Sequence, residues 1–128
     1  MRVLLDTHSL LWFLSGDEKL SATAQQVMID FENELVLSIA SLWEIAIKVS
    51  LGKLEIAEPF EELFPSQLRE HEIELLHITF PHLFHVVSLP FHHRDPFDRL
   101  IIAQSLAEEL PVITADPAFQ VYGVTIIW

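Results

Sequence analysis

Residues 2–14 read RVLLDTHSLLWFL, and this stretch decides the class of fold. Arg2–Leu5 is a short, mostly apolar run of the kind that forms a buried strand. It stops at Asp6-Thr7, a polar pair typical of a helix start, and a helix is predicted over residues 9–14. A strand that leads directly into a helix is the basic unit of α/β proteins, so the remaining sequence is expected to repeat it.

Short apolar runs and longer helical segments alternate along the rest of the chain. Further strands are predicted at residues 35–38, 73–77, 111–114 and 124–128. Further helices are predicted at residues 21–32, 40–51, 59–70 and 81–89, from Asp95-Pro96 to about residue 110, and briefly after Asp116-Pro117. This order predicts an α/β fold with a central, mostly parallel sheet of about five short strands, covered by helices on both faces.

The chain has 128 residues, and no repeat or linker divides it, so residues 1–128 are expected to form a single domain. Hydrophobic residues make up 51% and charged residues 20%, which excludes a disordered chain. The longest apolar run, residues 10–14, is far shorter than the roughly 20 residues that cross a bilayer. With no cysteine and no recognisable secretory signal, the protein is expected in the cytoplasm, without a membrane partner.

The charge balance is strongly acidic. Seven Lys and Arg residues face 19 Asp and Glu residues, which gives a net charge of −12. A broad basic surface for nucleic acid is therefore excluded. A basic partner, a cation site or a solubilising acidic surface remain as explanations. Seven glutamates lie between Glu55 and Glu74, opposed only by Arg69, and this block is expected to form solvated helix faces.

Four acidic residues are candidates for a functional site. Asp6 and Asp116 each follow a predicted strand, and Asp98 lies in the first turn of a predicted helix. Ligands of open α/β sheets bind beyond the carboxyl ends of the strands. Glu44 is the fourth candidate, because a carboxylate in an otherwise apolar helix is costly unless it is paired or bound to a cation. Glu44 and Lys48 are four residues apart, so a simple surface ion pair is the alternative.

The three aspartates also have structural explanations. Asp95 before Pro96 is a good helix N-cap, and Asp98 three residues later favours the helix dipole. Asp6 and Asp116 are equally able to cap the helices that follow them. Each aspartate taken singly is therefore compatible with a capping role.

The four acids together favour a metal site. If they converge to about 6 Å, each like-charge pair costs on the order of 3 kcal/mol at an effective dielectric near 20. Such a site must take up protons or bind a cation. Oxygen ligands in a chain without cysteine select a hard ion, Mg²⁺ or Mn²⁺. These ions lower the pKa of bound water and hold phosphate oxygens, which suits the hydrolysis of a phosphodiester.

Four segments make the sequence similar to PIN-domain ribonucleases, and within them to the VapC-like toxins of type II toxin–antitoxin systems. The segments are LLDTHSLLWFL (4–14), SIASLWEIAIKVSLGKL (38–54), HRDPFDRLIIAQS (93–105) and TADPAFQVYGVTIIW (114–128). They follow one another in the family's order and span nearly the whole chain. The resemblance implies a PIN-like three-layer α/β/α sandwich.

The resemblance also implies a site and an activity. The family's catalytic and metal-binding quartet falls on Asp6, Glu44, Asp98 and Asp116. The residues implied to support it are Thr7, Asp95 and Thr114. The implied activity is Mg²⁺- or Mn²⁺-dependent endoribonuclease cleavage of RNA, which leaves a 5′-phosphate and a 3′-hydroxyl. The implied partners are a cognate antitoxin and a second copy of the chain.

Several other residues have two interpretations. Arg99, beside Asp98, is expected either to orient a carboxylate or a phosphate or to form an ion pair on the helix surface. His82, His85 and the pair His92-His93 lack the spacing of a known catalytic zinc motif. His92, His93 and Arg94 are expected to be ordinary loop residues, with contact to substrate phosphates as the alternative.

Two apolar segments are expected to meet partners. Residues 80–91 are apolar enough for a buried element or a dimer contact. The helix with Trp12 and Phe13 is expected to receive an apolar antitoxin segment, whose Arg or Lys would reach the acidic quartet. The functional alternative is a non-catalytic binding module whose acidic pocket receives a basic peptide. A flavodoxin-like phospho-receiver is excluded, because it needs a lysine after its last strand and none follows Lys53.

Overall fold

The computed structural model describes residues 1–128, which form five strands and eight helices in the order expected for an α/β protein. The strands are β1 (Arg2–Leu5), β2 (Glu34–Ser38), β3 (Glu74–Leu76), β4 (Val112–Ile113) and β5 (Ile126–Ile127). The helices are α1 (Thr7–Ser15), α2 (Ala22–Ile29), α3 (Ile39–Ser50), α4 (Phe60–Leu63), α5 (Ser66–Glu70), α6 (Phe80–Ser88), α7 (Pro96–Glu108) and α8 (Ala118–Val121).

The strands form one sheet in the order β3-β2-β1-β4-β5, and every neighbouring pair is parallel. β1 lies at the centre, with Leu4 opposite Val36 of β2 and opposite Val112 of β4. The predicted five-stranded sheet is confirmed, and it is wholly rather than mostly parallel. All five carboxyl ends therefore lie along one edge of the sheet.

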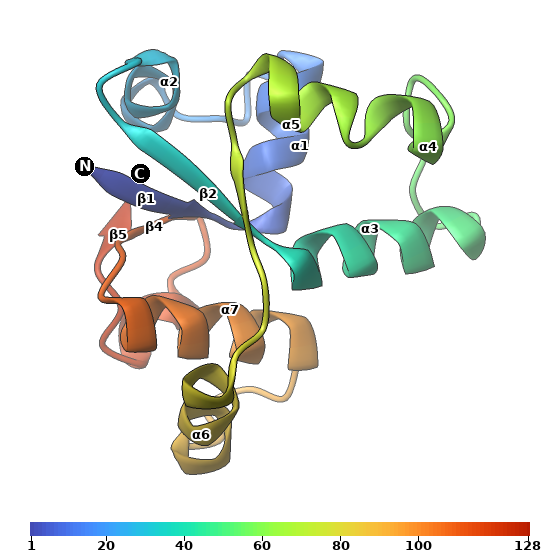
Figure 1. Ribbon diagram of the computed structural model, residues 1–128. Helices are drawn as coiled ribbons and strands as arrows, with labels where there is room; N and C mark the ends of the chain where they lie inside the picture. Colours follow the sequence, from blue (N-terminus) through green and yellow to red (C-terminus); the bar gives the residue numbers. More distant parts are fainter.

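Helices cover both faces of the sheet (Figure 1). Alternate side chains of β1 point to opposite faces, as the pleat requires. Val3 and Leu5 are fully buried in a core under α1, α2 and α3, whereas Leu4 is fully buried in a second core under α7 and α8. In Figure 1 helices α1, α2, α4 and α5 lie above the sheet, α3 extends to the right from the end of β2, and α6 and α7 lie below the sheet. This is the predicted three-layer α/β/α sandwich.

One predicted helix, residues 59–70, is wrong as a single element. The structure has α4 and α5 there, separated at Phe64-Pro65. Phe64 is extended, with φ −120° and ψ 133°, because a residue before proline is disfavoured in the helical region. Its side chain is buried in the core with Leu68. The break thus directs the Phe64 ring into the core, although the sequence pattern of this segment is that of one continuous amphipathic helix.

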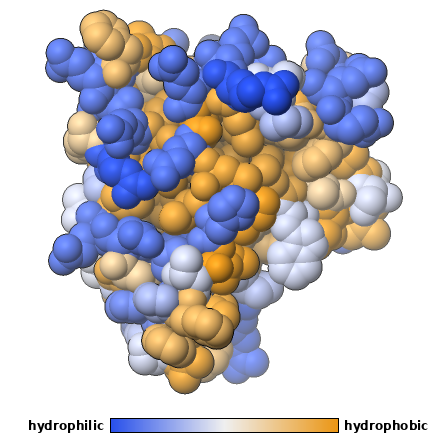
Figure 2. All heavy atoms as spheres, viewed as in Figure 1, coloured by the Kyte–Doolittle hydropathy of each residue, from blue (hydrophilic) through white to orange (hydrophobic).

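Some apolar side chains remain on the surface. In α6, Phe80, Phe84 and Val87 are 75%, 66% and 85% exposed. Figure 2 shows apolar atoms gathered at the lower end of this face, where Figure 1 places α6. None of the helices combines the length and the apolar character that a membrane crossing requires.

Candidate active site

The four candidate acids come from four elements that meet at one edge of the sheet. Asp6 caps α1 directly after β1, and Asp116 follows β4. Glu44 lies in α3, which begins directly after β2, and Asp98 lies in the first turn of α7. Because the sheet is wholly parallel, the carboxyl ends of β1, β2 and β4 bring Asp6, Glu44 and Asp116 to the same edge, and α7 with Asp98 packs against α3.

Thr114 joins Asp6 to the segment of Asp116. Its hydroxyl donates to Asp6 Oδ2 at 2.6 Å and accepts from the Asp116 backbone N–H at 3.0 Å. Asp6 Oδ1 accepts from the Ser9 backbone N–H at 2.7 Å, which is the N-cap bond of α1. The predicted capping role of Asp6 and its place beside Asp116 are therefore both present. Asp6 is 8% exposed, so little of its carboxylate faces water.

Glu44 is held by two side chains, Thr7 and Lys48. Its Oε1 accepts from the Thr7 hydroxyl at 2.8 Å, and the Ser41 hydroxyl lies 3.0 Å from that of Thr7. Its Oε2 lies 2.8 Å from the Lys48 ammonium. The expected pair with Lys48 exists, but it is not a simple surface pair, because Glu44 is only 4% exposed. Ser41 was missed by sequence reasoning, although its spacing of three residues from Glu44 puts both on one helix face.

Asp98 lies among the other acids. The pKa of Asp98 is raised to about 7, first by burial and then by four carboxylates: Asp95, Glu44, Asp116 and Asp6. Asp95 is the N-cap of α7, and its Oδ1 accepts from the backbone N–H groups of Phe97 and Asp98. The acids are therefore close enough to repel one another, as a shared site requires.

The side chains of the four acids do not converge on a single point. As the side chains stand, no three of them lie within reach of one ion. The oxygens of Asp6 and Glu44 point instead to hydroxyl, amide and ammonium donors. The atoms available as metal ligands are all oxygens, which come from carboxylates and from neighbouring threonine hydroxyls.

Neither role expected for Arg99 matches its contacts. It is only 6% exposed and lies in no ion pair, so it does not form the expected pair on the helix surface. Its guanidinium donates to the carbonyls of Pro90 at 2.8 Å and Leu89 at 3.2 Å, and it lies 4.1 Å from the centre of the Phe91 ring. Arg99 therefore fastens the loop between α6 and α7, because carbonyl groups rather than carboxylates surround it.

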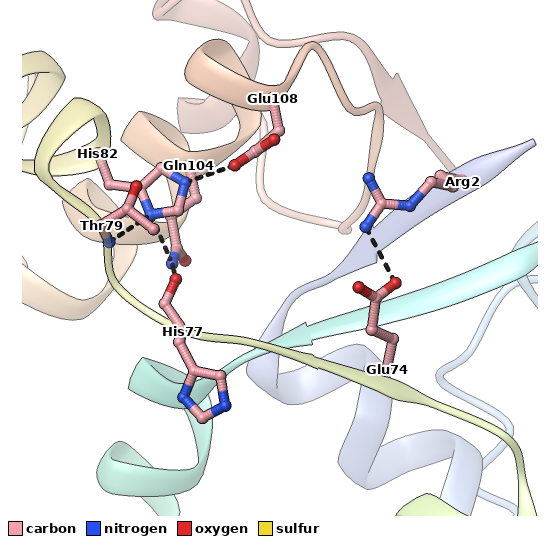
Figure 3. A network of polar contacts seen from close by, with 7 residues as sticks. All are labelled: Arg2, Glu74, His77, Thr79, His82, Gln104 and Glu108. Carbon is pink, nitrogen blue, oxygen red and sulfur yellow. Dashed lines mark hydrogen bonds and ion pairs between the residues drawn. The ribbon is translucent and has the colours of Figure 1, made fainter.

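His82 has a structural role in the packing of α6 against α7. His82 is fully buried, and its Nδ1 accepts from the Thr79 backbone N–H at 3.0 Å. Its Nε2 therefore carries the proton and donates to Glu108 Oε1 at 2.8 Å. Figure 3 shows this ring between Thr79 and Glu108, with Gln104 beside it. Both ring nitrogens are engaged, so His82 anchors α6 to α7.

Comparison with known protein families over almost the whole chain identifies the family of this protein. The model of the PIN domain matches residues 3–124. The chain belongs to the PIN-domain family. Ribonuclease VapC22 of Mycobacterium tuberculosis is 31% identical over 115 residues, which cover 89% of this chain and 86% of that protein. Ribonuclease VapC16 of the same organism is 37% identical over 59 residues, 46% of this chain and 42% of that protein.

Solved structures share the fold of this PIN domain. A chain of VapBC2 from Rickettsia felis, bound to a DNA fragment from its promoter, superposes with a TM-score of 0.73 at 16% identity, over 98% of this chain and 97% of that one. A chain of VapBC-1 from nontypeable Haemophilus influenzae gives 0.67 at 19% identity, over 98% and 96%. FitAcB from Neisseria gonorrhoeae gives 0.63 at 19% identity, again over 98% and 96%.

Proposed function

We propose that this PIN domain is a metal-dependent endoribonuclease and acts in the cytoplasm as the toxin of a toxin–antitoxin module. One observation carries the proposal: four separate segments bring carboxylates to one edge of the sheet, where burial and then the neighbouring carboxylates raise the pKa of Asp98. The similarity to ribonuclease VapC22 over 89% of the chain supports the same activity. We assign the catalytic roles to Asp6, Glu44, Asp98 and Asp116.

The donor set fits Mg²⁺ or Mn²⁺. Carboxylate oxygens are hard ligands, and a divalent cation would relieve the repulsion that, after burial, contributes to the raised pKa of Asp98. A bound ion supplies an activated water and holds phosphate oxygens during hydrolysis. Around it the chain supplies orientation. Thr7 holds Glu44, Thr114 holds Asp6, and Asp95 caps the helix that presents Asp98.

RNA binding must overcome the net charge of −12. Two divalent ions would cancel the four site carboxylates and leave about −8 elsewhere, so the field still repels a polyanion. With Arg99 buried, Arg94 is the exposed arginine of the 93–105 segment that remains for a phosphate. We therefore expect weak RNA binding that depends on local contacts and on the bound cation.

The antitoxin is proposed to be a protein with a basic and apolar tail. An apolar hollow of about 280 Å³ lies between α1 and the segment before α4, with Trp12, Leu11 and Leu54 among its lining residues. It supports the expectation that an apolar tail lies against α1. Phe13 lies apart from it, in a larger hollow beside His71. A cationic side chain of the tail would reach the acidic quartet at the start of α1.

The homodimer is proposed to form through α6. The Phe80 and Phe84 rings are stacked with their centres 6.2 Å apart, and both are exposed. A hollow of about 580 Å³ continues this apolar surface to Trp43 and Phe91. A soluble monomer rarely leaves so many large apolar side chains together on its surface.

Cleavage of RNA by the purified protein tests the function. We expect cleavage with Mg²⁺ or Mn²⁺, none in EDTA, and in Asp98→Asn no more than the EDTA level. Asp30→Asn is the matched control, since Asp30 is an exposed aspartate whose side chain accepts only a local backbone bond. If wild type and both variants fold but leave RNA intact with either ion, the non-catalytic binding module is the better explanation.

A further inference from the structure

The ion pair between Glu44 and Lys48 is unusual in its burial. The Lys48 ammonium lies 2.8 Å from Glu44 Oε2, and the side chains are 40% and 6% exposed. An exposed pair at this helical spacing contributes little to stability. Here the carboxylate is withdrawn from water, so loss of the ammonium would leave a buried charge without its partner. The pair therefore matters for the site and not only for the helix.

The two oxygens of Glu44 have different partners. Oε1 faces the neutral hydroxyl of Thr7, whereas Oε2 faces the positive charge of Lys48. A cation that takes Glu44 as a ligand must share Oε2 with the ammonium or displace it. The Lys48 ammonium can move off Glu44, because the side chain is partly in solvent and its stem is flexible.

We propose that Lys48 is a positioning residue that holds the Glu44 carboxylate and competes with a divalent cation for Glu44 Oε2. The inference rests on the proposed metal-dependent function. When the cation binds, the Lys48 ammonium moves off Glu44 into solvent. The lysine thus offsets part of the repulsion among the acids whenever no ion is bound, and it weakens ion binding in return.

Direct Mn²⁺ binding tests the competition. Lys48→Met keeps the apolar stem and removes the charge. We expect this variant to bind Mn²⁺ about tenfold more tightly than wild type does, because the repulsion between the ammonium and a divalent cation gives a factor of this size even when the dielectric constant is that of water. Lys48→Arg keeps the charge and should bind like wild type. Lys19→Met makes the same change of net charge at an exposed position beyond the far end of α1, and it should also bind like wild type.

A second measurement uses the unaltered protein. The acetylation rate of Lys48, followed by mass spectrometry, should rise on addition of Mn²⁺, because the freed ammonium loses its partner, while that of the exposed Lys19 stays constant. An unchanged rate, or Lys48→Met binding no tighter than wild type, overturns the inference and leaves the proposed function intact. Absence of Mn²⁺ binding by every variant overturns both, and neither measurement needs nuclease activity.

Discussion

Thr114 is a single hydroxyl on which the geometry of two acids depends. It donates to Asp6 Oδ2 and accepts from the Asp116 N–H, and its side chain is fully buried. A buried residue with two such bonds can be replaced by an isosteric apolar one without creating a cavity. The loss then reports on the hydrogen bonds alone.

Thr114→Val should lower the free energy of unfolding by about 1–3 kcal/mol, because a buried carboxylate oxygen loses its donor. It should also weaken Mn²⁺ binding by about 10- to 100-fold, as loss of a ligand-orienting bond does. Urea unfolding and titration with Mn²⁺ measure the two effects. Thr125→Val, at an exposed threonine, is the control. Equal stabilities of the two variants would contradict the bridging role.

Asp98 makes stability depend on pH. Its pKa of about 7 in the folded protein lies above its ordinary 3.8, so the folded state holds the proton more tightly. Its contribution to stability is therefore full below pH 3.8 and is lost as the pH rises through about 7. Asp98→Asn has no such loss. In EDTA, the variant should gain stability relative to wild type between about pH 4 and about pH 7.

Thermal midpoints across this pH range measure the gain. Asp30→Asn is the control at an exposed aspartate, and it should differ from wild type by a constant amount across this range. A difference between Asp98→Asn and wild type that does not grow with pH would show that burial and the neighbouring carboxylates do not raise the pKa of Asp98.

At the scale of elements, each helix end at the site serves two purposes. Asp95 and Asp6 are N-caps, and their carboxylates are also charges beside Asp98. The cap of α7 sets the start of the helical turn that carries Asp98, and the cap of α1 sets the position of Thr7. Structural and functional interpretations of these residues are therefore compatible, since one side chain accepts the helix N–H and still adds its charge to the site.

Asp95 allows the two purposes to be separated. Asp95→Ala removes both the cap and the charge, whereas Asp95→Ser removes the charge and keeps an oxygen that caps. We expect Asp95→Ala to be less stable than Asp95→Ser by about 1 kcal/mol. In both variants the pKa of Asp98 should fall below its value of about 7, as an NMR titration of its carboxyl carbon would measure. Equal stability of the two variants would mean that the cap contributes nothing.

At the scale of the whole molecule, the apolar face of α6 predicts a dimer. Light scattering should give twice the chain mass of 14.7 kDa at micromolar concentration. Phe84→Glu should give the monomer mass, because it places a charge in the apolar contact. Phe31→Glu is the control, since Phe31 is 91% exposed but lies between α2 and β2. A monomeric wild type, or a dimeric Phe84→Glu, would rule out this face.

The net charge of −12 predicts how the antitoxin associates. Opposite charges steer the encounter, so the association rate should fall as salt is raised from low to high concentration. An antitoxin whose tail arginines are changed to alanine should associate more slowly and inhibit less. Stopped-flow association rates and cleavage assays measure both. If neither salt nor the arginine changes alter binding, the acidic quartet is not where the tail docks.

Local patterns were enough to predict most of the fold. The apolar runs fixed the strands, and polar residues such as Asp6 and Asp95 marked the helix starts, because capping depends on residues a few positions apart. Alternation of strands and helices predicted the parallel sheet and with it the edge where the acids meet. Pro65 is a signal for the break between α4 and α5, but the amphipathic pattern on both sides of it favoured one continuous helix.

Tertiary structure alone decided the environment of each charged side chain. Arg99 and Asp98 are neighbours in sequence, yet Arg99 turns to the carbonyls of the α6–α7 loop while Asp98 faces the acids. The sequence shows that Glu44 is a costly charge. It does not show that Thr7 would contact one of its oxygens and Lys48 the other. The reason is physical: spacing along a helix sets which face a residue lies on, whereas its burial and its partners depend on segments that only packing brings together.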